Sequence, residues 1–262
     1  MVEVTRGVAV HRVSAQGRAQ VEDIVAAEFP LTIVLDGQEI VTLLCTPSDM
    51  KHLAIGFLSS EGLIAGGADI GRVMLDDRRG VVRVETVGGG VVERELPFKR
   101  LITSGCGRGA SFYSAADAMS QAGVESGLTM SAGEVTALVR QFQRRSEMYR
   151  ATGGVHSAAL CHGQDILVFA EDIGRHNAID KVFGECIVRG IPTADCVVVT
   201  SGRISSEILM KVARRDIPML ISRSAATDMA VELGLRLGVT VVGFVRGQRM
   251  NVYSHEWRVS DG

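Results

Sequence analysis

The second half of the chain alternates short apolar runs with amphipathic segments, and this alternation restricts the fold more than any other feature. Runs typical of β-strands occur near residues 156–161, 165–170, 196–200, 218–222 and 240–245, and helical patterns occur near 176–189, 205–215 and 227–237. Such an order is typical of an α/β sheet covered by helices. The sequence HGQD at 162–165 joins the first two strands as a hairpin, so we expect a mixed sheet that is otherwise largely parallel.

The sequence predicts two domains. Residues 128–262 form the α/β domain, whose first helix begins with the capping-box pattern SAGE at 131–134 and whose last short strand is expected at 251–253. Residues 1–127 form a smaller α+β domain. In it, Asp36-Gly37 joins a hairpin over residues 31–35 and 39–44, a helix follows the sequence PSD at 47–49, and short strands are expected near 72–75, 81–84 and 91–96.

Composition excludes several classes of protein. The chain has 262 residues, of which 46% are hydrophobic and 22% charged, as in an ordinary globular protein. A formal net charge of −2 provides no broad basic face for nucleic acid. No apolar run is long enough to cross a membrane, and residues 1–12 lack the apolar core of a signal peptide. The five cysteines, at 45, 106, 161, 186 and 196, show no close pairing, so we expect free thiols in a cytoplasmic protein.

Cys106 differs from the other cysteines because its neighbours suit a reactive thiol. It lies in the sequence TSGCGRG at 103–109, which has three glycines and no apolar side chain. A structural cysteine usually packs among aliphatic side chains, whereas glycines leave the sulfur accessible and Arg108 favours the thiolate. On composition alone, a glycine-rich turn that happens to contain a cysteine is the alternative. The other four cysteines adjoin apolar strand or helix residues, and we expect them to be inert.

Two polar clusters follow predicted strands, at positions where ligands gather in α/β sheets. The sequence EDIGRHN at 171–177 contains Asp172 and His176, and Lys181 lies on the helix that begins there. A solvated loop with one capping residue is the alternative interpretation. The sequence TSGRISS at 200–206 places Ser201, Gly202 and Arg203 at a helix start, where backbone N–H groups suit a phosphate; a simple cap by Ser205 is the alternative.

Two further clusters complete the candidate site. In FVRGQR at 244–249, Arg246 and Arg249 flank Gly247, an arrangement that suits a pyrophosphate, although charge also keeps an edge hairpin soluble. In TGGVHS at 152–157, His156 follows two glycines at a strand start, where a structural and a chemical role are about equally favoured. We expect no metal site of the zinc-deaminase type, because no histidine has glutamate two residues later and no two cysteines are three residues apart.

Five ordered motifs resemble those of the FdhD/NarQ family of formate dehydrogenase accessory sulfurtransferases. They are TSGCG (103–107), TGGVH (152–156), EDIGRHNAIDK (171–181), TSGR (200–203) and GFVRGQRMN (243–251). The sequences GFL (56–58) and SEG (60–62) fit the family as well. The resemblance runs from the first hairpin to the C-terminus, so it covers both predicted domains.

The resemblance implies a function. Members of the family carry sulfur as a cysteine persulfide from a cysteine desulfurase to the bis-guanine-dinucleotide molybdenum or tungsten cofactor of formate dehydrogenase, and Cys106 matches the carrying cysteine. The segment that holds the cofactor is matched by Phe244, Val245, Arg246, Gly247, Gln248 and Arg249. Ser201, Gly202 and Arg203 are further candidates for its phosphates. For cofactor contacts or proton handling the candidates are His156, Asp172, His176 and Lys181. The family has a three-layer, cytidine-deaminase-like α/β fold without zinc, and its members are usually homodimers that serve the formate dehydrogenase catalytic subunit.

One departure from the family pattern concerns the carrying cysteine. Many members have a second cysteine three residues later, where this chain has Gly109, so a persulfide on Cys106 has no resolving thiol within the loop. We therefore expect the protein to carry sulfur on Cys106 alone, without a relay between two cysteines. Two other functions stay open: a molybdopterin-binding chaperone that moves no sulfur, and a cysteine hydrolase with Cys106 as nucleophile and His156 or His176 as base.

Overall fold

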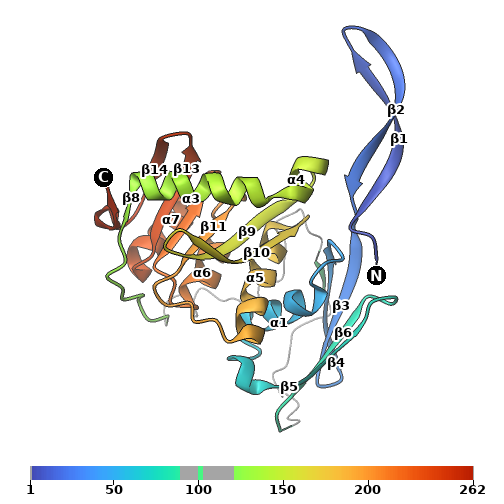
Figure 1. Ribbon diagram of the computed structural model, residues 1–262. Helices are drawn as coiled ribbons and strands as arrows, with labels where there is room; N and C mark the ends of the chain where they lie inside the picture. The colour runs from blue at the N-terminus through green and yellow to red at the C-terminus, as the bar shows by residue number, and fades with distance from the viewer. Residues whose placement is uncertain (1, 89–99, 103–120, 262) are drawn as a thin grey trace.

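Two mixed β-sheets with helices between and beside them make up the fold (Figure 1). The structure is a computed structural model that describes residues 2–88, 100–102 and 121–261. Cys106 and the strand expected at 91–96 therefore lie outside the described residues. The mixed α/β class expected from the sequence is confirmed.

The larger sheet contains six strands and lies in the second half of the chain. Its strand order is β10 (Asp165–Asp172), β9 (His156–His162), β11 (Val197–Thr200), β12 (Met219–Ser222), β13 (Thr240–Arg246) and β14 (Arg249–Val252). Strands β11, β12 and β13 are parallel, whereas β9 is antiparallel to both of its neighbours and β14 returns antiparallel to β13. The predicted mixed sheet with a parallel centre is therefore confirmed.

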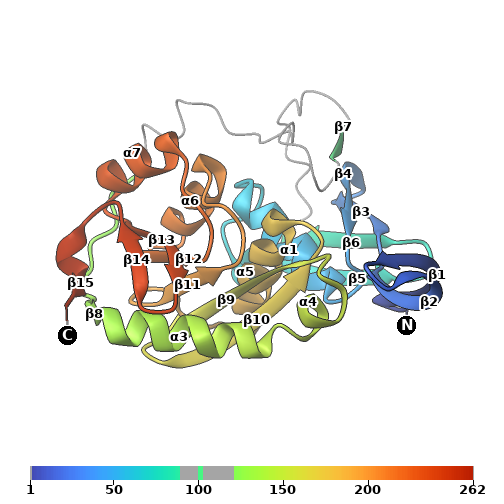
Figure 2. The ribbon, with the colours of Figure 1, turned by 90° about the horizontal axis from the view of Figure 1, so that it is seen from above.

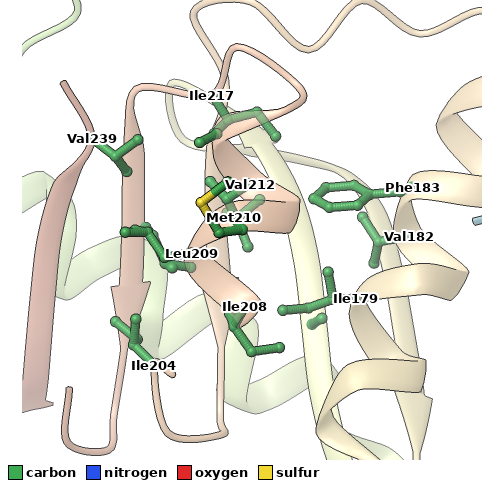
Figure 3. Close-up of a cluster of buried hydrophobic side chains, with 14 of the residues drawn as sticks. Ile179, Val182, Phe183, Ile204, Ile208, Leu209, Met210, Val212, Ile217 and Val239 are labelled. Atoms are coloured by element: carbon green, nitrogen blue, oxygen red, sulfur yellow. The ribbon is translucent and has the colours of Figure 1, made fainter. Parts of the chain in front are cut away.

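Helices cover both faces of this sheet (Figure 2). Helix α3 (Ala132–Arg145) begins with the predicted capping box, in which Ser131 Oγ accepts from Glu134 N and the Glu134 carboxylate accepts from Ser131 N. Its buried residues Val135, Leu138 and Phe142 pack on one face. The opposite face carries α5 (Arg175–Arg189), α6 (Ser206–Ala213) and α7 (Asp228–Leu237). Figure 3 shows apolar side chains of α5 and α6 that point toward one another, and they belong to one buried cluster.

The first half of the chain forms a five-stranded sheet that packs on one helix. Its order is β5 (Ile70–Asp76), β6 (Val81–Thr86), β3 (Phe29–Leu35), β4 (Gln38–Cys45) and β7 (Arg100–Ile102). Asp36 and Gly37 both have positive φ in the β3–β4 turn, which confirms the predicted hairpin. Helix α1 (Met50–Ser60) buries Leu53, Phe57 and Leu58 against this sheet.

Several elements do not appear among the sequence predictions. A hairpin of β1 (Thr5–Ser14) and β2 (Gly17–Ala26) extends away from the rest of the molecule (Figure 1). The short helix α4 (Glu147–Thr152) follows α3, and β8 (Met130–Ser131) pairs with β15 (Val259–Ser260). Two 3₁₀ turns, η1 (Gly67–Asp69) and η2 (Glu256–Arg258), complete the described elements.

Helices α1 and α5 cross closely and join the two halves of the molecule. A Cβ atom on Gly56 would overlap the carbonyl oxygen of Asp180, and one on Gly184 would overlap that of His52. Near the expected domain boundary, Val124 is buried in the core of the larger unit and its N–H donates to Leu237 O at 2.8 Å. Residues around Val124 therefore pack with the larger unit. None of the helices described is long and apolar enough to span a bilayer.

Candidate functional site

The polar clusters predicted from the sequence meet at one edge of the six-stranded sheet. Because β10, β11, β12 and β13 run in the same direction, their carboxyl ends share this edge with the start of β9. Asp172 at the end of β10 pairs with His156, and Thr200 at the end of β11 pairs with Ser222. Such an edge is the usual ligand-binding position in sheets of this kind.

His156 and Ser201 contact each other at the centre of this edge. His156 Nδ1 lies 3.3 Å from Ser201 Oγ, which also accepts from Ser157 N at 2.9 Å. The Ser201 N–H donates in turn to Ser157 O at 3.0 Å, so both its backbone and its side chain fix the end of β11 against the start of β9. Burial, together with the charges of Arg175 and Arg203, lowers the pKa of His156. The neutral form of the imidazole, which has one donor and one acceptor nitrogen, is therefore favoured.

Arg175 and Arg203 lie next to Gly202 and give this region an excess of positive charge. A Cβ atom on Gly202 would lie 2.8 Å from the Arg175 Cβ, so glycine is needed for the close approach of the two segments. Burial and then the charge of Arg203 lower the pKa of Arg175, and the buried Arg175 Nε has no hydrogen-bond partner among the described residues. Neither arginine forms an ion pair with a described carboxylate. The arrangement suits an anionic ligand.

His176 lies on the first turn of α5, beside the same group of cations. Its Nε2 is 3.4 Å from Glu207 Oε2. Burial, and then the charges of Lys211, Arg175 and His156, lower the pKa of His176 to about 3. It is therefore neutral near pH 7 and contributes polarity rather than charge to the edge.

The segment from Phe244 to Arg249 reaches the edge through its first residue. Phe244 has a φ of 53° and its N–H donates to Ser224 O at 2.9 Å, which joins β13 to the loop after β12. Val245 is 2% exposed and packs in the core on the α3 side, so its side chain is unavailable to a ligand. The remaining residues form an exposed turn and the start of β14: Arg246, Gly247, Gln248 and Arg249.

Asp172 and Lys181, predicted as cofactor contacts, form a buried ion pair instead. Lys181 Nζ lies 2.7 Å from Asp172 Oδ2, and the two side chains are 1% and 0% exposed. Asp172 also accepts from the N–H groups of Thr46 and Gly174, and Lys181 donates to the carbonyl oxygens of Thr46 and Glu171. All of these polar atoms are satisfied within the protein, so a ligand reaches them only if this network opens.

Two arginines at the edge were not assigned from the sequence. Arg175 lies inside the predicted motif at 171–177, next to the candidate contact His176. Arg223 directly follows β12, whose last residue, Ser222, is polar in an otherwise apolar strand. The signal that could have found Arg223 is the one that found Ser201, namely a polar residue at the carboxyl end of a parallel strand.

The four described cysteines are buried, as expected for structural thiols. Burial is the main factor that raises the pKa of Cys45, Cys161 and Cys186 to about 12, and it also raises the pKa of Cys196. A thiol with so high a pKa is protonated at neutral pH and is a poor nucleophile. Within the part of the chain that the structure describes, no group of three or more histidine, cysteine or acidic residues is placed to hold a metal ion.

Comparison with known proteins decides the family. The model of the FdhD/NarQ family matches residues 26–260. The chain belongs to this family. Proteins named sulfur carrier protein FdhD from Geobacillus kaustophilus and Bacillus subtilis are 43% and 41% identical to it over 241 and 243 residues, which is 92% and 93% of both chains in each pair. The resemblance inferred from the five motifs is thereby confirmed.

A solved structure shares the fold of this FdhD/NarQ chain. The crystal structure of a putative formate dehydrogenase accessory protein from Desulfotalea psychrophila superposes with a TM-score of 0.81, and the match covers 98% of this chain and 100% of the other. The two sequences are 23% identical, so this likeness shows the fold alone. The cytidine-deaminase-like, three-layer character of the fold stays a prediction.

Proposed function

We propose that this FdhD/NarQ member is a cytoplasmic sulfurtransferase that takes persulfide sulfur from a cysteine desulfurase onto Cys106. It then passes the sulfur to a bis-guanine-dinucleotide molybdenum or tungsten cofactor, which is its substrate and is destined for the formate dehydrogenase catalytic subunit. A homodimer is the proposed assembly. Relatives named sulfur carrier protein FdhD, at about 40% identity over nearly the whole chain, support this proposal.

The burial of the other four cysteines is the observation that supports Cys106 as the sulfur-carrying residue. A sulfur carrier needs an accessible thiol that ionises near neutral pH. Cys45, Cys161, Cys186 and Cys196 are buried and their pKa values are raised, so none of them meets this requirement. Of the five cysteines in the sequence, Cys106 is the one left, in a stretch that contains Arg108 and three glycines.

The sheet edge supplies suitable groups for the anionic substrate. Arg175 and Arg203 carry positive charge that no described carboxylate neutralises through an ion pair. Gly202 itself is buried, its N–H donates to Thr200 Oγ1 and its carbonyl oxygen accepts from Ser222 Oγ, so it supports the close packing of Arg175 and offers no free backbone group. The exposed Arg246 and Arg249 extend this positive character along the β13–β14 turn. The diphosphates of a guanine-dinucleotide substrate match such a surface, because guanidinium groups bind phosphate through two hydrogen bonds.

The first chemical step is a thiolate–persulfide exchange. The Cys106 thiolate attacks the outer sulfur of the desulfurase persulfide, the S–S bond of that persulfide breaks, and the desulfurase cysteine leaves as a thiolate. The product is a persulfide on Cys106, so the numbers of atoms and electrons are unchanged. Since position 109 is glycine, residues 103–109 hold no second thiol that could attack the Cys106 sulfur, form a disulfide with it and release the carried sulfur as hydrosulfide.

Mass spectrometry under non-reducing conditions tests this step. The purified protein is incubated with an active cysteine desulfurase and cysteine, and intact and peptide masses are measured. We expect a gain of one sulfur atom on the peptide that contains Cys106, and its loss on addition of a reductant. Cys106→Ala should not be loaded, whereas the matched control Cys196→Ala, which changes a buried cysteine, should be loaded like the wild type.

Loading that persists in Cys106→Ala would contradict the assignment of the carrier. If the wild type also gains no sulfur, although the desulfurase is shown to be active on another acceptor, the cofactor-chaperone function would be favoured. In that case Cys106→Ala would still support formation of active formate dehydrogenase.

A further inference from the structure

The β1–β2 hairpin projects from the molecule, and the proposed sulfur transfer uses none of its residues (Figure 1). Its two ten-residue strands pair with each other over their whole length and, among the described residues, with no third strand. The base is held, because Ala27 N donates to Val4 O and a Cβ atom on Gly154 would lie 3.5 Å from that of Ala26. A hairpin of two strands is marginally stable on its own in water, so we expect a further contact along its length.

The hairpin carries apolar side chains on both faces. Val10 pairs with Val21, and Val8 and Val25 point to the same side because side chains alternate along each strand. Val25 is 39% exposed, and Ile24 on the opposite face is 47% exposed. Neither face packs in one of the three apolar cores. Contiguous exposed apolar residues of this kind mark an interaction surface.

The two edges of the hairpin differ in charge. Strand β1 contains two arginines and a histidine but no acidic residue, whereas β2 contains Arg18 together with Glu22 and Asp23. Asp23 already pairs with Arg12 across the hairpin at 3.6 Å. Within the part of the chain that the structure describes, neither Arg18 nor Glu22 forms an ion pair. Strand β2 therefore offers unused charges of both signs along one edge.

Two copies of β2 are complementary when they pair antiparallel about a two-fold axis at Gln20. In this register Arg18 lies opposite Glu22 of the partner subunit on both sides of the axis, and Ala19 lies opposite the partner's Val21. A shift by two residues in either direction loses both ion pairs. Each cross-strand pair of opposite charges contributes about 0.2–1 kcal/mol, so the charges favour this register over its neighbours.

We propose that the β2 strands of two copies of the chain pair antiparallel about Gln20, so that the two hairpins form one four-stranded sheet. The two-fold symmetry closes the assembly at a dimer, and the basic β1 strands at its outer edges oppose the addition of further strands. The proposal assigns a surface to the homodimer proposed above and rests on that part of the proposed function. It is independent of sulfur transfer.

Sedimentation equilibrium of the full-length protein tests the two charge pairs. Glu22→Arg places an arginine opposite the partner's Arg18 on both sides of the axis, and it should raise the dissociation constant of the dimer at least about tenfold. Arg18→Glu should have a similar effect. The double variant Arg18→Glu/Glu22→Arg restores opposite charges and should dimerise like the wild type, a rescue that a misfolded hairpin would not give. Arg6→Glu, a matched reversal on β1, should leave the dissociation constant unchanged.

Disulfide cross-linking tests the register in a Cys106→Ala background, in which the four remaining cysteines are buried. Gln20→Cys places two thiols at the proposed axis, and mild oxidation should give a covalent dimer in non-reducing electrophoresis. His11→Cys is the matched control, because His11 is exposed and pairs with Gln20 but lies on β1, at the outer edge. It should stay monomeric in the same assay.

Three results would overturn the proposal: a wild type that is monomeric at every concentration, a dimer that neither charge reversal weakens, and cross-linking of His11→Cys as efficient as that of Gln20→Cys. The second of these would keep the homodimer and place its interface elsewhere. Sulfur loading of Cys106 is measured separately and enters none of these assays, so a failure here is distinct from a failure of the carrier function.

Discussion

At the scale of a single residue, the surroundings of His176 in the candidate site determine its protonation state. Burial and the neighbouring cations Lys211 and Arg175 lower the pKa of His176 from 6.5 to about 3, and Glu207 at 3.4 Å does not reverse this. Between these values the unfolded chain binds a proton that the folded protein lacks. The free energy of unfolding therefore falls as the pH decreases through this window, and the contribution of His176 is fully present above it.

We expect His176→Gln to flatten this dependence, because glutamine keeps a hydrogen-bond donor but cannot be protonated. From about pH 7 to about pH 5 the wild type should lose more stability than the variant, with a difference in slope of at most about 1.4 kcal/mol per pH unit. Urea unfolding at several pH values measures both slopes. Parallel curves for the two proteins would show that His176 titrates alike in the folded and unfolded states.

The residue scale also shows where prediction from the sequence ended. The positions of His156, Ser201, Gly202, Arg203 and His176 at one edge follow from the order of strands and helices, which the periodicity reveals. The role of Asp172 and Lys181 does not, because their partner Thr46 lies more than a hundred residues earlier in the chain. A polar residue at the end of a strand gives the same sequence pattern whether its side chain faces a ligand or the other half of the protein.

At the scale of elements, the crossing of α1 and α5 depends on two glycines. Gly56→Ala would place a methyl group on the Asp180 carbonyl oxygen, and Gly184→Ala would place one on that of His52. Because the overlapping atoms belong to the backbone of a helix, the overlap is relieved only if one helix moves as a whole. We expect each variant to lower the free energy of unfolding by about 3 kcal/mol or more.

Gly133→Ala on α3 is the matched control, since a Cβ there would meet Ser131 Oγ at 3.8 Å, an ordinary contact. It should change stability by less than about 1 kcal/mol, with a gain from the better helix propensity of alanine. Urea denaturation followed by circular dichroism compares the three variants. A Gly56→Ala protein as stable as the control would mean that the helices separate at little cost.

Elements with a buried face could be predicted from the sequence, and those without one could not. Strands β3, β4, β6, β9, β10, β11, β12 and β13 and helices α1, α3, α5, α6 and α7 each bury apolar side chains, which create the periodic pattern. By contrast, most residues of β1 and β2 are exposed on both faces, and α4 has six residues of which none is buried. For these elements pairing and chain geometry determine the structure, and hydrophobic periodicity carries little signal.

At the scale of the whole molecule, two buried networks reinforce the α1–α5 contact. The Asp172–Lys181 pair bonds to Thr46, and Asp180 accepts from Ser60 Oγ at 2.7 Å while it pairs with Lys211 at 2.5 Å. Both ion pairs lie within the larger unit, and separation of the two halves would break the hydrogen bonds that Thr46 and Ser60 make to them and would leave these buried charges less well satisfied. The two sheets should therefore not unfold independently, although each has its own apolar core.

Leu31→Ala in β3 tests this coupling, because it destabilises the smaller sheet while the single tryptophan, Trp257, reports on the larger unit. Leu31 is fully buried, so the substitution should cost about 2–5 kcal/mol. We expect the urea midpoint by Trp257 fluorescence to shift as much as the midpoint by circular dichroism. Val10→Ala, in the projecting β1–β2 hairpin and outside the three cores, should shift neither. A Trp257 transition that stays in place while circular dichroism moves would show two separately folding halves, and the α1–α5 crossing with the hydrogen bonds of Thr46 and Ser60 would then be too weak to join them.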